Sequence, residues 1–395
     1  MEISFFTESY LPTRDGVAQE TAALAVALSR LGHGVHVYAP DPGVPIPDPV
    51  GEAARIPVTR VASVPVPLYP EYRWAVFPFA RLIARSAGRD ADVIHLHTPG
   101  ILGSAGFLAG RRFRKPVVGT FHTNVWAMRE SFPSTFAVQL FFRAAWWYTL
   151  GTYWRCDAAT APTDEARQAL ERHARKPWRR RIEVVPNGIE VARFHPEIRV
   201  PDWRERCGLP NAPLVTYLGR LTQDKGVVRF LDAVAEAAGD ASFVSIVAGR
   251  GPEEETVRRR LRTDPILARR VRFVGPVAEE EKAALLAQSD LFVLPSTSDT
   301  SSIALLEAMA SGACCVASDL GGPKEILQDG RTGRLVPVLE RGRLSTTIRE
   351  LLDDPGQRAR LAATAREYVR AHASIEATAR RFISLYELLL AERSR

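Results

Sequence analysis

The sequence is poor in cysteine and contains no long apolar run. Its 395 residues include four cysteines (Cys156, Cys207, Cys314 and Cys315), which show neither a Cys-x-x-Cys pair nor the spacing of metal ligands. We therefore expect reduced thiols inside a cytoplasmic protein. No run reaches the roughly 18 apolar residues of a membrane span, and residues 1–7 lack the basic start of a signal peptide. These absences argue against a disulfide scaffold and an integral membrane protein.

The charge of the chain is unevenly distributed. The formal net charge is +7; residues 1–200 hold 24 Lys and Arg against 18 Asp and Glu, whereas residues 201–395 hold 28 against 27. A basic surface suits nucleic acid or an anionic membrane. The chain lacks zinc-finger, helix-turn-helix and aromatic RNA-binding signatures, so we expect no nucleic-acid partner. The densest basic run comprises Arg172, Arg175, Lys176, Arg179, Arg180 and Arg181.

The length predicts two domains, and 46% apolar with 25% charged residues is typical of a globular protein. In the first half, short apolar segments alternate with helical patterns such as 20–31. This alternation predicts a parallel sheet with helices on both faces. The Pro- and Val-rich segment 40–70 is expected to be an irregular surface excursion. The expected strands are 3–8, 35–39, 92–97, 116–122, 158–161 and 182–185.

The same pattern restarts after Pro196, which predicts an α/β fold of two Rossmann-like domains, 1–196 and 197–374. The last long helix is expected at 375–393. Ligands of such sheets bind beyond the carboxyl ends of the strands, so we expect the ligand in a cleft between the domains. The expected strands of the second domain are 214–218, 243–247, 271–274, 291–294 and 314–317.

The most informative segment is Asp-Thr-Ser-Ser-Ile-Ala-Leu-Leu-Glu at 299–307. Ser301 or Ser302 is suited to cap a helix that begins there, so Asp299 precedes the helix and Glu307 lies inside it. The free N–H groups of a helix start suit phosphate. Two carboxylates beside a phosphate cradle fit a nucleotide-sugar. The alternative is a solvated loop Asp and a helix Glu paired with a nearby Arg.

Three further strand ends of the second half carry candidate ligand groups. Arg220 and Lys225 lie five residues apart on a strand-to-helix loop. Two cations there are suited to bind both phosphates of a diphosphate and to neutralise the charge that develops on it as it leaves. Gly249 ends the next strand and allows close backbone approach, and Val274 ends a third, where backbone groups face a nucleobase. The alternatives are an ordinary basic surface loop and ordinary turns.

In the first half, Gly16 lies between a loop and a helix start, and His122 ends a strand. The GxGxxG dinucleotide fingerprint is absent, which argues against an NAD-dependent dehydrogenase. His122 either hydrogen-bonds a sugar or relays a proton, or it is a structural histidine. His95 and His97 share one face of a strand, but no acid at suitable spacing supports a metal there. The aromatic stretch 136–148 is either an interfacial helix or a buried one.

As a set, these features resemble the retaining glycosyltransferases of family 4, which have the GT-B fold of two Rossmann-like domains facing each other across a cleft. The resemblance spans nearly the whole chain and includes Pro186-Asn-Gly-Ile189 and Gly321-Gly-Pro-Lys-Glu-Ile326. Two positions depart from the family pattern. Asp299 replaces the first Glu of the acidic pair, and Asp15 precedes Gly16 where a paired Gly is usual.

The resemblance implies a role for each candidate. Arg220 and Lys225 would hold the donor diphosphate, and Glu307 would bind the ribose hydroxyls. Asp299 and His122 would contact the transferred sugar. Backbone near Ser302 and Ile303 would meet sugar and phosphate, while Gly16 would let its loop approach donor and acceptor. The family needs no metal and no cofactor beyond the nucleotide sugar, and its last helix returns to the first domain.

We therefore expect a metal-independent, retaining transferase that moves a hexose from a nucleoside-diphosphate sugar to an acceptor. The basic first half and its aromatic helix favour a membrane lipid or lipid-linked glycan as acceptor. A cytoplasmic protein, peripheral on the inner face of the plasma membrane, fits this expectation. The alternatives are a nucleotide-sugar epimerase on the same fold and a non-catalytic protein that binds sugar nucleotides.

Overall fold

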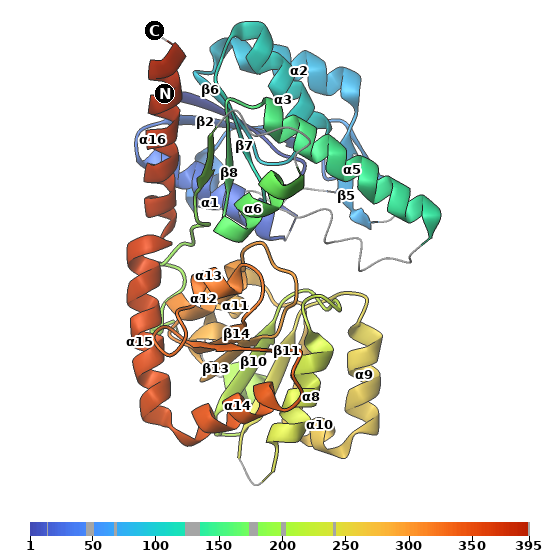
Figure 1. Cartoon of the computed structure of the whole chain (residues 1–395), viewed down its shortest axis with the longest axis vertical. Helices are drawn as coiled ribbons and strands as arrows, with labels where there is room; N and C mark the ends of the chain where they lie inside the picture. The colour runs from blue at the N-terminus through green and yellow to red at the C-terminus, as the bar shows by residue number, and fades with distance from the viewer. Residues whose placement is uncertain are drawn as a thin grey trace. The chain divides into compact units, whose positions relative to one another are not determined.

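A computed structural model describes residues 1–13, 15–44, 51–66, 69–122, 135–173, 181–198, 203–239 and 242–393. The chain divides into two compact units (Figure 1). The first unit comprises Met1–Gly188 and Ile375–Arg395, and the second comprises Ile189–Ser374. The C-terminal segment therefore belongs to the same unit as the N-terminus. The first unit ends at Gly188, whereas the sequence analysis expected the boundary at residue 196.

The first unit is built on a seven-stranded sheet in the order β3-β2-β1-β6-β7-β8-β9, with every pair parallel. Its central strands are runs of buried residues, as expected of a sheet covered on both faces. The strands are β1 (Glu2–Phe6), β2 (Gly34–Pro40), β3 (Val58–Val61), β6 (Val93–Leu96), β7 (Val117–Thr120), β8 (Ala158–Ala161) and β9 (Arg181–Val184).

Helices cover both faces of this sheet (Figure 1). On one face α1 packs against α16, and the core there contains Phe5, Leu24 and Phe382. On the other face α2 packs against α3, around Phe6 and Leu102. A third cluster joins β8 to α5 and α6. The helices are α1 (Gly16–Arg30), α2 (Phe77–Asp90), α3 (Ile101–Phe113), α5 (Phe136–Arg155), α6 (Asp164–His173) and α16 (Ile375–Arg393).

The expectation of an irregular excursion at 40–70 is wrong for its described part. This segment contains the short 3-10 helix η1 (Gly51–Arg55), then β3, and then an antiparallel hairpin of β4 (Ser63–Val66) and β5 (Tyr69–Ala75). The abundance of Pro misled the interpretation, because β3 and β4 are edge strands. An edge strand tolerates Pro where a central strand does not.

The second unit contains a six-stranded parallel sheet in the order β12-β11-β10-β13-β14-β15. Clusters of buried side chains fill both of its faces. The strands are β10 (Leu214–Leu218), β11 (Val244–Ala248), β12 (Val271–Gly275), β13 (Leu291–Leu294), β14 (Cys314–Ser318) and β15 (Arg334–Val336). The sequence analysis located all of these except β15, which has only three residues.

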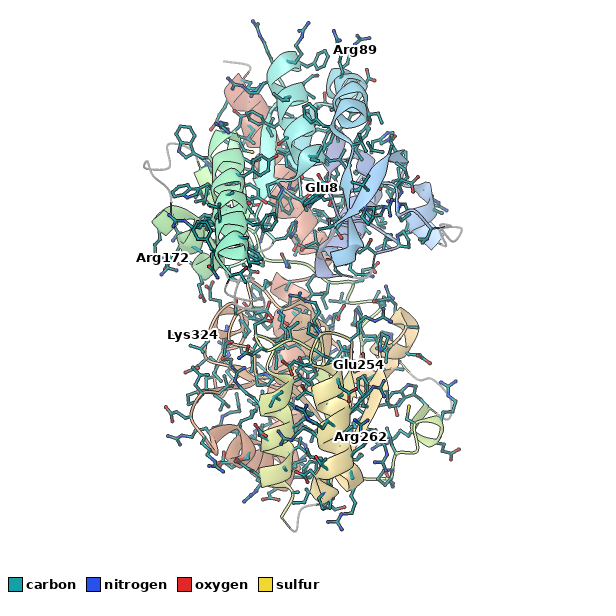
Figure 2. All side chains as sticks on the ribbon, turned by 90° about the vertical axis from the view of Figure 1, so that its right-hand side faces the viewer. Glu8, Arg89, Arg172, Glu254, Arg262 and Lys324 are labelled. Carbon is teal, nitrogen blue, oxygen red and sulfur yellow. The ribbon has the colours of Figure 1, made fainter. Side chains whose placement is uncertain are left out.

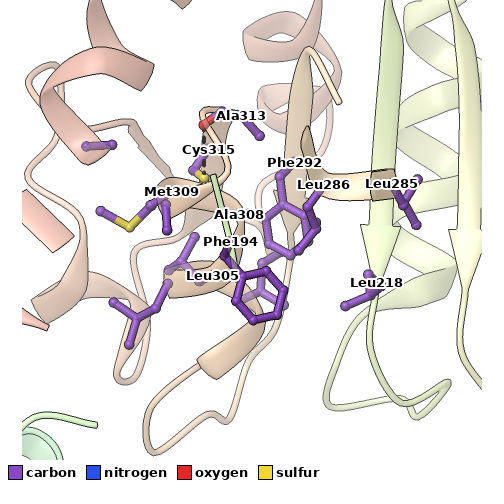
Figure 3. Packing of buried hydrophobic residues seen from close by; sticks show 14 of the residues in the cluster. Phe194, Leu218, Leu285, Leu286, Phe292, Leu305, Ala308, Met309, Ala313 and Cys315 are labelled. Carbon is purple, nitrogen blue, oxygen red and sulfur yellow. Dashed lines mark hydrogen bonds between the residues drawn. The ribbon is translucent and has the colours of Figure 1, made fainter. Parts of the chain in front are cut away.

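The helices of the second unit also lie on two faces. In one core, Leu305, Ala308 and Met309 of α12 (Ile303–Ala310) pack with Phe292 and Phe194 (Figure 3). The same core receives α11 (Glu279–Ala287) and α15 (Pro355–His372). The opposite core contains α8 (Val227–Ala237), α9 (Glu254–Thr263), α10 (Pro265–Arg270) and α14 (Arg343–Asp353). The short helices α7 (Trp203–Arg206) and α13 (Pro323–Ile326) complete the unit.

Within the described ranges, no helix is long and apolar enough to cross a membrane. Charged side chains such as Arg89, Arg172 and Arg262 lie at the outside of the molecule (Figure 2).

Candidate functional site

In the second unit, three glycines bring the ends of β10, β11 and β12 together. Gly249 has φ of +139°, and a Cβ there would lie 1.9 Å from the carbonyl oxygen of Gly219. The Gly249 N–H donates to the Gly275 carbonyl at 2.8 Å. Because no side chain fits at Gly249, the backbones of the β10 and β11 ends lie in close contact. Val274 is half-buried beside it, at the end of β12.

The loop that carries Arg220 and Lys225 is held by backbone hydrogen bonds. Leu221 N–H donates to the Arg250 carbonyl at 2.8 Å, and Thr297 N–H donates to the Asp224 carbonyl at 2.8 Å. Gly226 has φ of +76°, and a Cβ there would lie 2.1 Å from the Pro295 carbonyl oxygen. The loop is therefore fixed against the loop that follows β13, where Asp299 lies.

Lys225 and Asp299 form an ion pair, with 2.7 Å between Nζ and Oδ2. Both side chains are largely buried, at 17% and 7% exposed. The Asp299 carbonyl accepts a hydrogen bond from Gly322 N–H at 2.7 Å, which holds the loop in place. Arg220 is exposed; among the described residues no ion pair to its guanidinium is found. The loop thus presents one cation paired with Asp299 and one cation open to solvent.

The start of α12 is formed as the sequence predicts. Ser302 is its N-cap, and its side-chain oxygen accepts from Leu305 N–H at 3.3 Å. The first N–H groups of a helix, here beginning with Ile303, lack partners within the helix and carry partial positive charge. This helix start follows Asp299 closely, so backbone N–H groups with partial positive charge and a carboxylate lie a few residues apart.

Glu307 lies inside α12 and is 4% exposed. Its Oε1 is 2.6 Å from Nζ of Lys282 on α11, and the same Nζ is 3.0 Å from Glu279 Oε2. Burial alone would lower the pKa of Lys282, but the two carboxylates outweigh it and raise the pKa above its ordinary value. The sequence analysis missed Lys282, because nothing in an acidic helix start distinguishes a buried lysine from a solvated one.

In the first unit, His122 follows the end of β7. Its side chain is 4% exposed, and Nδ1 lies 3.2 Å from Oε2 of Glu20 on α1. Nε2 lies 3.1 Å from Nδ1 of His97, which follows β6. Burial holds the pKa of His97 well below its ordinary value. His95 contacts Thr120 and Tyr386 instead, at 2.6 and 2.7 Å. The two strand histidines therefore belong to a buried polar network.

Asp15, which departs from the family pattern, has a structural role. It is the N-cap of α1, and its Oδ1 accepts from Ala18 N–H at 2.8 Å. Its Oδ2 accepts from the Ser9 hydroxyl. Gly16 is the first residue of the helix and is exposed. The sequence analysis anticipated a helix start near Gly16 but not that the preceding carboxylate would cap it.

Glu8 is a second group that the sequence analysis missed (Figure 2). It follows β1, and its Oε1 accepts from Leu102 N–H in the first turn of α3 at 2.5 Å. Its backbone N–H donates to the Thr98 hydroxyl at 2.7 Å. Burial raises the pKa of Glu8 to about 7, although backbone hydrogen bonds oppose the shift. A spacing motif could not have found it, because its partners lie about ninety residues away in the chain.

The aromatic helix α5 is half buried and half exposed. Phe142, Trp146 and Leu150 belong to the core of the unit. Phe136 and Leu140 are 84% and 56% exposed. Of the two alternatives for this helix, burial therefore holds for one face only, and the second face is an apolar surface. Its other exposed members are Phe141, Trp147 and Tyr148.

Only part of the basic run lies within the described residues. Arg172 and Arg181 are exposed, and Arg181 pairs with Glu183 at 3.1 Å. Arg175, Lys176, Arg179 and Arg180 lie outside the described residues.

The two units carry the predicted site residues separately. Gly16 and His122 belong to the first unit, and Arg220, Lys225, Gly249, Val274, Asp299, Ser302, Ile303 and Glu307 belong to the second. Among the described residues, no cluster of three His, Cys, Asp or Glu side chains is arranged to hold a metal ion.

Comparisons with known proteins agree with this layout. Residues 14–193 match the model described as Glycosyltransferase Family 4, and residues 212–354 match the model described as Glycosyl transferases group 1. A GDP-mannose-dependent alpha-mannosyltransferase of Mycolicibacterium smegmatis is 33% identical over 340 residues, which cover 86% of this chain and 85% of that protein. The chain belongs to the family 4 glycosyltransferases.

Two further proteins extend the comparison. A phosphatidyl-myo-inositol mannosyltransferase of the same organism is 31% identical over 370 residues, covering 90% of this chain and 85% of that protein. The structure of a sucrose-phosphate synthase from Thermosynechococcus elongatus superimposes with a TM-score of 0.80 at 21% identity, covering 99% of this family 4 chain and all of the other. This likeness shows the GT-B class of two Rossmann-like domains.

Proposed function

We propose that this family 4 member is a retaining, metal-independent transferase that moves a hexose from a nucleoside-diphosphate sugar to an acceptor. The observation that carries the proposal is the ion pair between Lys225 and Asp299, 2.7 Å apart, beside the capped start of α12. It gathers a cation, a carboxylate and free backbone N–H groups, which are the groups that a diphosphate and a sugar require.

In this proposal the diphosphate binds Arg220, Lys225 and the first N–H groups of α12. Without donor, Lys225 neutralises Asp299; with donor, its ammonium also faces the phosphates. Asp299 then accepts hydrogen bonds from hydroxyls of the transferred sugar, and backbone at Ser302 and Ile303 meets sugar and phosphate. Because charge develops on the leaving diphosphate, fixed cations there favour the transition state over the ground state.

The nucleoside occupies the neighbouring edge of the same sheet. Gly249 allows the ligand to approach backbone, and the end of β12 at Val274 offers backbone groups to the base. Glu307 accepts from the ribose hydroxyls through its carboxylate, which Lys282 holds at 2.6 Å. Gly16 and His122 are the residues of the first unit that we assign to the same reaction, His122 beside the transferred sugar.

Two arguments support the retaining and metal-independent parts. The relative is named an alpha-mannosyltransferase that depends on GDP-mannose. An alpha product formed from an alpha-linked donor means retention. The cations Arg220 and Lys225 support the metal-independent part, because they would take the electrostatic role that a metal ion has in other transferases. Full activity in excess chelator is expected; loss of activity that Mg²⁺ or Mn²⁺ restores would contradict this part.

We propose a membrane lipid or lipid-linked glycan as acceptor. The exposed aromatic face of α5, with Phe136 84% exposed, is suited to the interface of a membrane. The relative named for phosphatidyl-myo-inositol acts on a lipid by that name. The basic run at 172–181 adds attraction to an anionic inner leaflet, which fits a cytoplasmic, peripheral protein.

A screen of nucleotide sugars tests the proposal. GDP-mannose, UDP-glucose and related donors are compared by slow hydrolysis, by transfer to lipid extract and by thermal stabilisation. A true donor at 100 times its dissociation constant stabilises the protein by about 2.7 kcal/mol. Release of nucleoside diphosphate with a sugar of retained configuration is the expected result. Epimerised donor without acceptor would favour an epimerase, and stabilisation without turnover would favour a non-catalytic binding protein.

A further inference from the structure

Glu20 is a charged residue in the apolar interior of the first unit. It lies on α1, where its neighbours Ala18, Leu24 and Ala25 are buried, and Glu20 itself is 4% exposed. Placing a carboxylate in such surroundings is costly unless a partner compensates. Within the described part of the chain, the His122 ring is the basic group within ion-pair distance of Glu20, at 3.2 Å.

The contact has the distance of an ion pair rather than the alignment of a hydrogen bond. The negative charge of the carboxylate nevertheless bears on which ring nitrogen carries a proton. A carboxylate beside Nδ1 attracts a proton to that atom and repels a bare lone pair. His122 Nε2 then faces Nδ1 of His97 at 3.1 Å, so both ring nitrogens face protein groups.

His97 is itself held in place by burial and by its neighbours. It is 1% exposed, and its ring lies 4.0 Å from that of His95 and 4.4 Å from that of Phe5. The His122 ring is therefore fixed from two sides, by a carboxylate on α1 and by a neutral imidazole on the adjacent strand end. Contacts at both ring nitrogens disfavour a second orientation of the ring.

We propose that Glu20 is a positioning residue, whose carboxylate holds the proton of His122 on Nδ1 and so fixes the imidazole that meets the transferred sugar. This inference rests on the proposed function for the place of the sugar. It also means that His122 contributes the shape and polarity of its ring and its backbone, and does not accept a proton from the acceptor hydroxyl.

The first test is spectroscopic and needs no activity. The full chain, which has eight histidines, is labelled with ¹⁵N-histidine, and His122→Asn assigns the signals of His122. We expect a protonated Nδ1 in the unmodified protein, retained in Glu20→Gln, which keeps an oxygen beside Nδ1, and lost in Glu20→Ala. A bare Nδ1 in the unmodified protein, or the same signals in all three, would overturn the proposal.

The second test is kinetic, with GDP-mannose and UDP-glucose as donors. We expect Glu20→Ala to lower kcat by roughly 10- to 100-fold with little change in donor KM, because it disturbs orientation rather than donor affinity. Glu20→Gln should recover most of that loss. Thr21→Ala is the matched control, because it removes a fully buried polar side chain from the same helix. Equal losses in Glu20→Ala and Thr21→Ala would show a structural role only.

The two tests separate the failure of this inference from the failure of the proposed function. If the unmodified protein turns over neither donor, the proposed function loses its support, while the ¹⁵N signals still decide whether Glu20 holds the His122 proton. If transfer occurs and Glu20→Ala is as active as the unmodified protein, the positioning role is wrong and the transferase assignment remains.

Discussion

The two units hold their buried carboxylates in different ways. In the second unit, Glu307 and Asp299 each meet a lysine, at 2.6 and 2.7 Å. In the first, Glu20 meets an imidazole at 3.2 Å, and Glu8, whose pKa is about 7, meets a helix N-terminus. Lysine stays charged over the whole neutral range, whereas the raised pKa of Glu8 places its change of protonation within that range. The difference predicts that pH changes near neutrality alter the stability of the first unit and leave the stability of the second nearly unchanged.

Removing Lys282 should give the largest effect. Lys282→Met leaves Glu307 buried without its cation, and breaking a buried pair on one side costs about 3–5 kcal/mol of stability. We expect the loss in the thermal transition of the second unit, followed by calorimetry. Lys282→Arg keeps a cation and is the control. A Lys282→Met protein as stable as the parent would show that the pair contributes little, and the contrast between the units would weaken.

Glu8 should produce the largest pH effect. Because its pKa is raised from 4.5 to about 7 in the fold, its contribution to stability is full below about pH 4.5 and is lost as pH rises through about 7. At roughly 1.4 kcal/mol per pKa unit, the loss at pH 8.5 is about 3 kcal/mol.

Glu8→Gln keeps the oxygen that accepts from Leu102 N–H and removes the charge. The variant should therefore match the parent at pH 4.5 and exceed it in stability at pH 8.5, as measured by thermal melts across that range. Glu2→Gln, at an exposed site on β1, the strand that precedes Glu8, is the control and should change neither melt. A Glu8→Gln protein no more stable than the parent at pH 8.5 would show that Glu8 ionises without cost.

The same contrast explains what could be predicted from the sequence. Strand ends and helix starts of the second unit are encoded locally: Ser302 caps α12, and Arg220 and Lys225 follow β10 directly. The sequence pattern therefore predicted the elements on which these residues lie, including the helix of the acidic pair and the loop before it. Most of the strands of both sheets were located for the same reason, since each is a short apolar run between loops.

The partners in the first unit are set by tertiary structure. Glu20 and His122 are about a hundred residues apart, as are Glu8 and Leu102, and no spacing rule links them. Lys282 was missed in the second unit for the same reason, because burial of a lysine depends on the packing of α11 against α12. The edge strands within 40–70 were missed because proline was taken as a sign of irregular structure, although the edge strand of a sheet tolerates proline.

The expected effect of Glu307 on donor affinity is smaller than the stability effects expected at Lys282 and Glu8. Glu307→Ala removes a charged hydrogen-bond acceptor for the ribose, which is worth roughly 1.5–3 kcal/mol. Titration calorimetry with GDP and UDP measures the change. Glu279→Ala is the matched control, because Glu279 also pairs with Lys282, at 3.0 Å, but has no proposed contact with the donor. Equal affinities in the two variants would remove Glu307 from the donor site.

The smallest effects are expected at the surface of the first unit. If α5 and the basic run meet a membrane, Arg172→Gln should weaken binding to vesicles with anionic lipid by about 1 kcal/mol, and the loss should fade as salt rises. Phe136→Ser, at a site 84% exposed, should weaken binding by a similar amount at every salt concentration, because apolar contact is not screened.

Vesicle co-sedimentation at low and high salt measures both surface variants. Leu339→Ser is the matched control, since Leu339 is an apolar residue of the second unit that is 68% exposed. Donor affinity should stay the same in all three variants. If Leu339→Ser weakens vesicle binding as much as Phe136→Ser does, vesicle binding is not specific to the surface of the first unit. If the parent binds no vesicles at low salt and transfers sugar efficiently to a soluble acceptor, the lipid acceptor is wrong while the transferase assignment stands.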